Sequence, residues 1–250
     1  MFKQIGEMNI VVDVGNTRVK YAFFEEEACI ECGYGWEALE KEIKKWKGRG
    51  EELSLLLAGS GSVSDTYIAL LKSLVDEFIE ASSMMELPLK IDYKTPTTLG
   101  FDRIANCIGA IKLFPKVPLL VIDSGTCITY NQVGASGVFL GGNISPGVEI
   151  RFKSLHHYTA KLPCLTPTEN YGNVGKTTNE AILNGVMLGT LFEVKNYITQ
   201  FQEKEKNAMV VITGGNAHFW KSKFGEEVFF SKDLGLIGLN EVLKSMKKDC

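Results

Sequence analysis

The sequence lacks the features that mark several large classes of protein. Its 250 residues include 27 Lys and Arg against 30 Asp and Glu, a net charge of −3, so no basic surface for nucleic acid is expected. The longest apolar runs, such as residues 53–58 and 117–122, are too short to cross a membrane. No charged-then-apolar leader precedes the first apolar run, which favours a cytoplasmic protein. We therefore expect neither a nucleic-acid partner nor a membrane partner.

Cysteine is also scarce for the length of the chain. Six cysteines in 250 residues suggest free thiols and not a disulfide framework. Cys29 and Cys32 form a C-x-x-C pair, but no second pair or nearby histidine completes a metal-binding set. Side chains three residues apart in a strand point to opposite faces, so the pair is not expected to act together. The sequence also has no G-x-x-x-x-G-K-[ST] segment, which excludes a P-loop enzyme.

Two short segments of the chain are almost alike. Residues 9–17 read Asn-Ile-Val-Val-Asp-Val-Gly-Asn-Thr, and residues 119–126 read Leu-Leu-Val-Ile-Asp-Ser-Gly-Thr. Each is an apolar β-type run that ends in Asp-x-Gly and leads into a second β-type run. An internal repeat of this kind indicates two related domains. Each domain would offer a glycine turn and a carboxylate to one shared nucleotide, as in a two-lobed phosphoryl-transfer enzyme.

Hydrophobic periodicity and turn residues predict the same order of elements in both halves. In the first half we expect strands at 9–12, 19–24, 28–34, 53–58 and 90–93, with helices at 36–47, 64–80 and from 102 onward. Pro115 and Pro118 mark the domain boundary. In the second half we expect strands at 119–123, 126–133, 137–144 and 210–212, with helices after 147, at 178–203 and at 234–247. The expected fold class is α/β, with mixed sheets flanked by helices in two domains, residues 1–116 and 117–250.

The repeated turn has chemistry that suits a phosphate. Gly15 accepts a positive φ and lets the backbone approach a ligand, and amide N–H groups at such a turn can converge on a phosphate. Lys20 adds a positive charge on the adjoining strand. Phosphate repels Asp13, so its expected role is to hold Mg²⁺ or the waters of Mg²⁺. The alternative is a plain β-hairpin in which Gly15-Asn16 makes the turn and Asp13 caps it.

A second group of residues surrounds the start of the helix at 102. Asp102 and Arg103 follow Gly100, while Tyr93 and Pro96 lie in the preceding loop. A carboxylate there can accept the proton of a substrate hydroxyl as the hydroxyl attacks phosphorus. An arginine there can bind a carboxylate or the transferring phosphoryl group. The alternative is that Asp102 only caps the helix and interacts with its dipole.

Taken together and in this order, these segments resemble the type III pantothenate kinases, bacterial enzymes of the first step of coenzyme A synthesis. The resemblance runs almost from end to end, over segments 13–20, 93–96, 100–103, 123–126, 141–147, 159–163, 175–178 and 213–215. That family belongs to the superfamily of acetate and sugar kinases, heat-shock chaperones and actin. The resemblance therefore implies two duplicated RNase H-like (actin-like ATPase) domains, in agreement with the internal repeat. Relatives commonly read Asp-Phe-Gly-Thr-Ala-Thr-Thr in the second turn, where this chain has Ser124, Cys127 and Ile128.

The resemblance implies a site residue by residue. ATP would be bound by Asp13, Val14, Gly15, Asn16, Thr17, Arg18, Val19, Lys20 and Thr126. Pantothenate would be bound by Tyr93, Gly100, Phe101, Asp102, Arg103 and Thr178, with Asp102 as the base for the primary hydroxyl. Asp123 would hold a monovalent cation, K⁺ or NH₄⁺, and Asp13 would hold Mg²⁺ through water. Members of the family are dimers whose pantothenate pocket is completed by the partner subunit, so a homodimer is implied.

Three other functions stay open from the sequence. A kinase of the same superfamily that acts on a sugar or a carboxylic acid would keep the paired turns and change the substrate loop. A chaperone-like or actin-like ATPase would hydrolyse ATP without an acceptor. A regulatory protein is the third alternative, although the acidic balance disfavours direct binding to DNA. The presence of both Asp13 and Asp102 favours an active enzyme.

Overall fold

The chain forms two compact units. The computed structural model describes residues 6–247 except 16, 60, 62 and 83. The first unit comprises residues 1–113 together with 233–250, and the second comprises residues 114–232. Each unit is described by itself below. None of the helices in the described part of the chain has the length and apolarity that crossing a bilayer requires.

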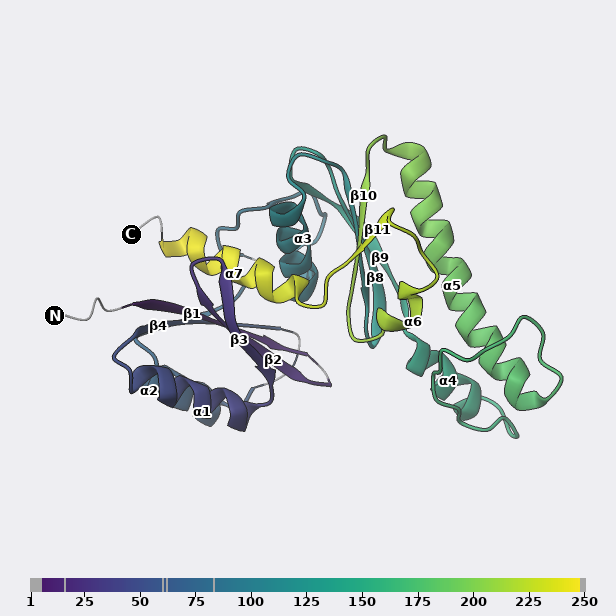
Figure 1. The fold of residues 1–250 in the computed structure, drawn as a ribbon, viewed down its shortest axis with the longest axis horizontal. Coiled ribbons are helices and arrows are strands. Elements are labelled where there is room, and N and C mark those ends of the chain that lie inside the picture. The colour runs from purple at the N-terminus through teal and green to yellow at the C-terminus, as the bar shows by residue number, and fades with distance from the viewer. Residues whose placement is uncertain (1–5, 16, 60, 62, 83, 248–250) are drawn as a thin grey trace. The chain divides into compact units, whose positions relative to one another are not determined.

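The first unit is built on a five-stranded sheet in the order β3-β2-β1-β4-β5. Its strands are β1 Glu7–Val14, β2 Val19–Glu25, β3 Ala28–Tyr34, β4 Glu52–Gly59 and β5 Glu77–Glu80. Its helices are α1 Trp36–Lys47, α2 Asp65–Leu74, α3 Phe101–Leu113 and α7 Leu234–Lys247, and it also holds β6 Lys90–Ile91 and the 3₁₀ turn η1 Pro96–Thr98. Helices α1 and α2 cover one face of the sheet, and α7 lies along the other face (Figure 1).

The second unit contains a sheet in the order β11-β10-β7-β8-β9. Its strands are β7 Leu119–Ser124, β8 Cys127–Val133, β9 Val138–Pro146, β10 Met209–Thr213 and β11 Val228–Phe230. Its helices are α4 Val148–His157, α5 Thr178–Lys204 and α6 His218–Lys221. The apolar side chains Val194, Ile198 and Phe201 of α5 pack on one face of the sheet. Burial of each such side chain contributes about 1.5–3 kcal/mol, which fixes the long helix on the sheet.

The two sheets repeat one topology. In each, the first strand lies in the middle: β1 runs antiparallel to β2 and parallel to β4, and β7 runs antiparallel to β8 and parallel to β10. The next strands repeat the pattern, because β3 and β9 are antiparallel to their neighbours while β5 and β11 are parallel to theirs. The internal duplication predicted from the two Asp-x-Gly segments is therefore confirmed at the level of strand order.

The predicted helix over residues 64–80 is wrong at its C-terminal end. Ser64 caps α2 by accepting a hydrogen bond from the Tyr67 N–H at 3.3 Å, but the helix ends at Leu74, and residues 77–80 form β5. The Leu53 N–H donates to the Asp76 carboxylate at 2.9 Å, and the Asp76 N–H donates to the Leu53 carbonyl at 2.9 Å. These two bonds align the chain with β4. The apolar spacing alone could not separate a last helical turn from this short strand.

The C-terminal helix belongs to the first unit, whereas the sequence placed residues 117–250 in one domain. Helices α3 and α7 cross at two glycines, Gly109 and Gly238. A Cβ on Gly109 would come within 3.0 Å of the Leu234 carbonyl oxygen. A Cβ on Gly238 would also come within 3.0 Å of the Ala105 carbonyl oxygen. Two helix backbones that approach so closely leave no space for a side chain. This crossing explains why α7 returns to the first unit.

Strand β3 contains a bulge that the sequence did not reveal. The β2–β3 register shifts between Phe23 and Phe24, so that Phe24 pairs with Cys29 and Ala22 pairs with Cys32. Ala22 and Phe24 are two residues apart and share a face of β2. Their partners therefore share a face of β3, and the expectation that Cys29 and Cys32 point to opposite faces was wrong.

Candidate active site

The two repeated turns lie at the ends of equivalent strands. Strand β1 ends at Val14, and the Gly15 N–H donates to the Arg18 carbonyl at 3.0 Å. Strand β7 ends at Ser124, and the Gly125 N–H donates to the Cys127 carbonyl at 2.9 Å. The first turn is one residue longer than the second. Both segments join antiparallel strands as hairpin turns, and the chemistry depends on what surrounds them.

A glycine with positive φ lies beside each turn, at the end of the parallel neighbouring strand. Gly59 (φ 136°) follows β4 residue Ala58, which pairs with Asp13. Gly214 (φ 96°) follows β10 residue Thr213, which pairs with Asp123. A Cβ on Gly59 would come within 3.0 Å of Val14 backbone atoms, and one on Gly214 would come as close to the Asp123 carboxylate. The repeat thus extends from the turns to the strands that support them.

In the first unit, the predicted nucleotide residues lie along this turn. Val14 is buried, Gly15 is half-buried, and Thr17 and Arg18 are exposed. Val19 and Lys20 are half-buried and begin β2. The register places Lys20 directly opposite Asp13, so a cation and a carboxylate lie next to the turn of the hairpin. Asn16, the remaining predicted residue of this turn, lies outside the described residues.

In the second unit, Asn216 holds the Asp123 turn. Its backbone N–H donates to the Ser124 carbonyl at 2.8 Å, and its side-chain amide donates to the Gly125 carbonyl at 3.3 Å. The same amide donates to the Glu149 carboxylate at 2.8 Å. Asp123 itself is half-buried. Asn216, in the loop after β10, therefore fixes the turn and links it to α4, a role that the sequence analysis did not identify.

Ser124 and Trp220 form a buried pair behind the same turn. The indole N–H of Trp220 donates to the Ser124 hydroxyl at 3.0 Å, and both side chains are fully buried. Ser124 is one of the positions at which this chain departs from the common family sequence. A small residue at 124 leaves room for the large indole of α6, and the hydrogen bond satisfies two polar atoms in an apolar setting.

Thr126 is exposed at the tip of the turn. Its carbonyl accepts a hydrogen bond from the Gly147 N–H at 3.0 Å, and a Cβ on Gly147 would come within 3.0 Å of that carbonyl. The Gly141–Gly147 segment noted in the sequence thus ends on the Thr126 turn. A glycine is required at 147 because the start of α4 packs directly on the backbone of this turn.

A partly buried polar cluster, Tyr130, Ser145, Arg151 and Glu193, supports the segment before Gly147. The Glu193 carboxylate accepts hydrogen bonds from Tyr130 at 2.7 Å, Ser145 at 2.5 Å and Arg151 at 2.5 Å. Arg151 also donates from Nε to the Pro146 carbonyl at 2.8 Å. Burial acts to raise the pKa of Glu193, but these hydrogen bonds outweigh it and lower the pKa below its usual value. The cluster ties β8, β9, α4 and α5 together behind the turn.

The predicted acceptor-site residues come together at the start of α3. The Asp102 carboxylate accepts a hydrogen bond from the Arg103 N–H at 2.9 Å. A Cβ on Gly100 would come within 3.0 Å of the Asp102 Oδ1, so this glycine makes room for the carboxylate. The Arg103 guanidinium carbon lies 6.0 Å from the centroid of the Tyr93 ring. Phe101 is buried and belongs to the core, while Asp102 is half-buried.

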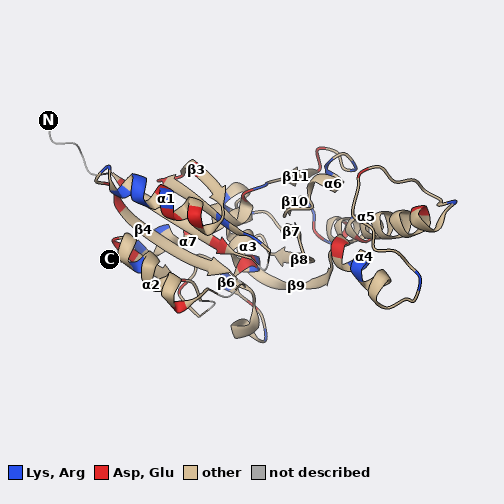
Figure 2. Ribbon diagram, turned by 90° about the horizontal axis from the view of Figure 1, so that it is seen from below, with Lys and Arg blue, Asp and Glu red and all other residues tan. Residues whose placement is uncertain are grey.

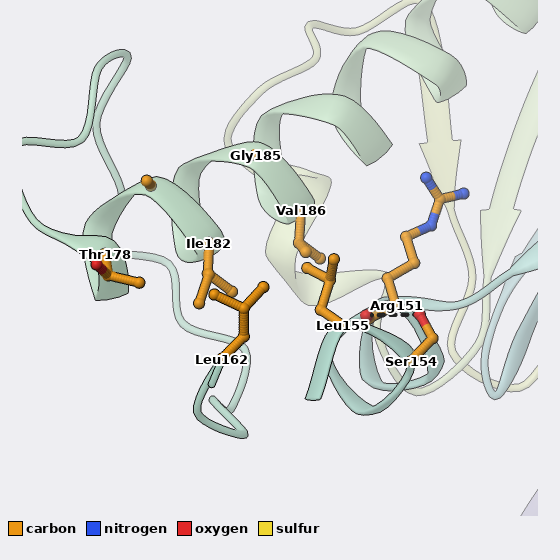
Figure 3. Close-up of a pocket in the computed structure, with 9 residues that line it drawn as sticks. Arg151, Ser154, Leu155, Leu162, Thr178, Ile182, Gly185 and Val186 are labelled. Carbon is orange, nitrogen blue, oxygen red and sulfur yellow. Dashed lines mark hydrogen bonds between the residues drawn. The ribbon is translucent and has the colours of Figure 1, made fainter. Parts of the chain in front are cut away.

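Thr178, the remaining residue predicted to bind the acceptor, belongs to the second unit and begins α5. Thr177 caps the helix in a capping box with Glu180, so the Thr178 hydroxyl is not needed for the cap. Thr178 lines a pocket of about 650 Å³ between α4 and α5 (Figure 3). The pocket is lined by Arg151, Ser154, Leu155, Leu162, Thr178, Ala181, Ile182, Gly185 and Val186. Its walls are mainly apolar, and the Arg151 guanidinium points away from them.

The donor sets of the two turns limit which metal ions they can hold. Among the described residues, no group of three or more His, Cys, Asp or Glu side chains is arranged to hold a metal ion. A transition-metal centre of such side chains is therefore not present in that part of the chain. Single carboxylates beside backbone carbonyls and hydroxyls suit hard cations that keep water or share phosphate oxygens. Asp13 and Asp123 each supply a single carboxylate near the end of a middle strand.

Comparison with known proteins identifies the family. The model of the type III pantothenate kinase family matches residues 9–200. This chain belongs to the type III pantothenate kinase family. The type III pantothenate kinase of Flavobacterium psychrophilum is 35% identical, over 96% of this chain and 100% of that protein. The type III pantothenate kinase of Azobacteroides pseudotrichonymphae is 37% identical, over 96% of this chain and 98% of that protein.

Solved structures support the expected fold class. A Baf family protein from Campylobacter jejuni superposes with a TM-score of 0.60 at 19% identity, covering 96% of this chain and 99% of that one. The activator of 2-hydroxyisocaproyl-CoA dehydratase from Clostridium difficile, solved with bound ADPNP, gives a TM-score of 0.53 at 12% identity, with 96% and 97% covered. At these identities the likeness concerns the fold alone. This member of the type III pantothenate kinase family has the duplicated α/β architecture that its internal repeat predicts, and its fold class is the actin-like ATPase one that the family resemblance implies.

Proposed function

We propose that this chain transfers the γ-phosphoryl group of ATP to the primary hydroxyl of pantothenate, the first step of coenzyme A synthesis. The observation that carries the proposal is its membership of the type III pantothenate kinase family over nearly its full length. The geometry agrees with phosphoryl transfer, because each unit ends its middle strand in Asp-x-Gly beside a glycine with positive φ.

The nucleotide-binding residues are Asp13 to Lys20 of the first unit and Thr126 of the second. Thr17 and Arg18 are exposed in the hairpin turn at Gly15, and Lys20 supplies positive charge opposite Asp13. Such a turn binds phosphate through N–H groups without a helix N-terminus. Mg²⁺ is usually held by one or two carboxylates with water and substrate phosphates, which fits the single carboxylate of Asp13.

Asp123 is the proposed ligand of a monovalent cation, K⁺ or NH₄⁺. Its carboxylate is half-buried and lies against Gly214, close to the backbone carbonyls that Asn216 holds in place. Carboxylate and carbonyl oxygens are suitable donors for such an ion. When bound, Mg²⁺ and the monovalent cation would offset the negative charge of the phosphates.

Asp102 is the proposed base for the pantothenate hydroxyl. Its Oδ1 accepts the Arg103 N–H, which leaves the other carboxylate oxygen to orient and deprotonate a substrate hydroxyl. Tyr93 and Arg103 would contact the polar end of pantothenate, since a guanidinium binds a carboxylate in a bidentate manner. The protein would act mainly by positioning and electrostatics, as expected for a loose phosphoryl-transfer transition state.

Thr178 and the α4–α5 pocket point to a homodimer. The surface of this unit exposes large apolar side chains, namely Tyr158 (82% exposed), Val174 (81%) and Phe192 (61%). Helix α5 carries no charged residue from Ala181 to Phe192 and is tan over most of its length in Figure 2, in contrast to the mixed charges of α1. The uncharged stretch of α5 that lines the pocket is the proposed contact surface, because contiguous apolar surface favours protein–protein contacts. A partner subunit packed there would complete the pantothenate pocket. The expected location of the enzyme is the cytoplasm.

Release of ADP tests the proposal. The protein is incubated with ATP, Mg²⁺ and K⁺, with and without pantothenate, and in parallel with Na⁺ in place of K⁺. Turnover that requires pantothenate and falls in Na⁺ would support both the substrate and the Asp123 cation site. Turnover indifferent to pantothenate would favour an actin-like or chaperone-like ATPase, and turnover only with a sugar or carboxylic acid would assign another kinase activity.

A further inference from the structure

The bulge in β3 brings two cysteines to one face of an edge strand. Strand β3 is the outermost strand of the first sheet. Cys29 pairs with Phe24 and Cys32 pairs with Ala22, so Ile30 is the extra residue that the bulge adds between them. Without this extra residue, the third position along the strand would point to the opposite face.

Neighbouring side chains confirm the assignment of faces. Glu31 reaches the α1 side of the sheet, where its carboxylate lies 3.0 Å from the Lys45 ammonium. Gly33 points the same way, because a Cβ there would meet the Tyr21 side chain of the α1–α2 core. Cys32, between these two residues, therefore faces away from α1. Cys29 faces the same side, where the negative charge of Asp233, just before α7, helps to raise the pKa of its thiol.

The separation of the two cysteines suits a covalent link. Their partners on β2 are two residues apart, a span of about 6.8 Å along a strand. Disulfides join residues whose Cα atoms are roughly 4.4–6.8 Å apart, so this span falls at the upper end of that range. The Cys29 thiol donates to the Glu31 carbonyl at 3.7 Å, within the segment that leads to Cys32, and both cysteines are exposed.

We propose that Cys29 and Cys32 form a dithiol site that exchanges reversibly with low-molecular-weight disulfides. The Cys32 thiolate attacks one sulfur of the small disulfide, forms a mixed disulfide and releases one thiolate. The Cys29 thiol then loses its proton to solvent, and its sulfur attacks the Cys32 sulfur and releases the second thiolate. The two cysteines lose two electrons in forming the Cys29–Cys32 bond, and the small disulfide gains them and becomes two thiols.

The order of attack follows from the surroundings of Cys29. Burial, followed by the influence of Cys32 and Asp233, raises the pKa of the Cys29 thiol to about 11. Little thiolate forms at such a site near neutral pH, so Cys29 is the poorer first nucleophile. It is suited to be the resolving thiol, because the register places it on the same face of β3 as Cys32.

Oxidation with glutathione disulfide tests the proposal. The full-length protein with Cys250→Ser is incubated with glutathione disulfide, free thiols are alkylated, and peptides are mapped by mass spectrometry. We expect a Cys29–Cys32 disulfide in at least about ten times the amount of mixed disulfide at either residue, and full reversal by dithiothreitol. Exposed Cys127 and Cys164 are internal controls that should stop at mixed disulfides.

Two variants separate the proposed exchange from general thiol reactivity. In Cys29→Ser, the mixed disulfide should accumulate on Cys32, and in Cys32→Ser, the reaction at Cys29 should be at least about tenfold slower. Phenylarsine oxide, which bridges two close thiols, should bind the parent protein tightly and neither variant. Persistent glutathione on Cys32 in the parent protein, or pairing with any other cysteine, would overturn the proposal. Because both side chains are exposed, unchanged melting temperatures are expected in both variants.

Discussion

Gly214 lies against the carboxylate of Asp123, so closely that a methyl group at position 214 would come within 3.0 Å of the Asp123 Oδ1. The backbone of Gly214 also has a positive φ of 96°, which residues other than glycine rarely adopt. A Cβ on the adjacent Gly215 would have no neighbour within 4 Å, and the backbone there has no such constraint. Two consecutive glycines of one loop therefore differ in what they tolerate.

Gly214→Ala is expected to displace the Asp123 carboxylate and to weaken activation by K⁺. We expect stability to fall by about 1–3 kcal/mol from overpacking and backbone strain, and the K⁺ concentration for half-maximal activity to rise at least about tenfold. Gly215→Ala is the matched control for folding and should unfold at nearly the parental denaturant concentration. Equal stability loss in the two variants would contradict the role assigned to the Gly214–Asp123 contact.

Asp102→Asn is expected to lower kcat by about 10²- to 10⁴-fold while the fold is retained, because asparagine is a poor general base. The asparagine side-chain oxygen can still accept the Arg103 N–H, so the melting temperature should change little. Steady-state ADP release with saturating pantothenate measures the effect. Normal turnover in this variant would remove Asp102 from the mechanism.

Glu193→Gln is expected to destabilise the second unit in a pH-dependent way. The folded state lowers the pKa of Glu193, so the stabilisation is present above the unfolded-state pKa of about 4.3 and is lost as pH falls through the lower folded-state value. At pH 7 the variant should be less stable by about 1–3 kcal/mol, since Arg151 and two hydroxyls lose a charged partner. Urea midpoints from pH 3 to 7 should converge at the acidic end. A constant difference across this range would show that the charge of Glu193 is not what matters.

Trp220→Phe is expected to leave the buried Ser124 hydroxyl without its hydrogen-bond donor. The lost hydrogen bond should lower the free energy of unfolding by about 1–3 kcal/mol, in addition to the effect of the smaller aromatic ring on packing. Ser124→Ala in the Trp220→Phe background removes the stranded hydroxyl and should recover part of that stability. A double-mutant cycle gives the coupling energy, and strict additivity of the two substitutions would argue against the hydrogen bond as a contributor.

Gly238→Ala is expected to force α3 and α7 apart. The new methyl group would meet the Ala105 carbonyl, so we expect a loss of about 2–3 kcal/mol from overpacking. Gly189→Ala, also within a helix but with nothing near its Cβ position, should be neutral or stabilising by up to about 1 kcal/mol. Urea denaturation compares the two variants. A destabilised Gly189→Ala with an unaffected Gly238→Ala would refute the proposed crossing geometry.

The sequence predicted those parts of the fold that depend on local patterns. The Asp13 and Asp123 turns, their flanking apolar strands and the Thr177 cap are all set by residues close in the chain, and the repeat made the duplication readable. The grouping of Tyr93, Gly100 and Asp102 was also predictable because they are near one another in sequence. The assignment of their roles stays a proposal that rests on the family.

Other features depend on partners far along the chain and left no local signal. Strand β5 forms because Asp76 pairs with Leu53, and the bulge in β3 is visible only in its register with β2. Asn216 holds the turn of Asp123 and Thr126 through the Gly125 carbonyl, and Glu193 holds Ser145 in the segment that packs on this turn. Both partners are far away in the sequence. In the sequence, only the charged residue Glu193 directly after the uncharged stretch of α5 could have indicated this cluster, because a buried charge needs partners.

The return of α7 to the first unit has a consequence for biosynthesis. The first unit combines residues 1–113 with 233–250. The second unit is therefore synthesised between the two segments of the first unit. On the ribosome, residues 114–232 have emerged in full before α7 can reach its groove on α3. The later-made unit is therefore expected to complete its folding first, and the earlier-made one must wait, with one face of its sheet uncovered, until the last helix leaves the exit tunnel.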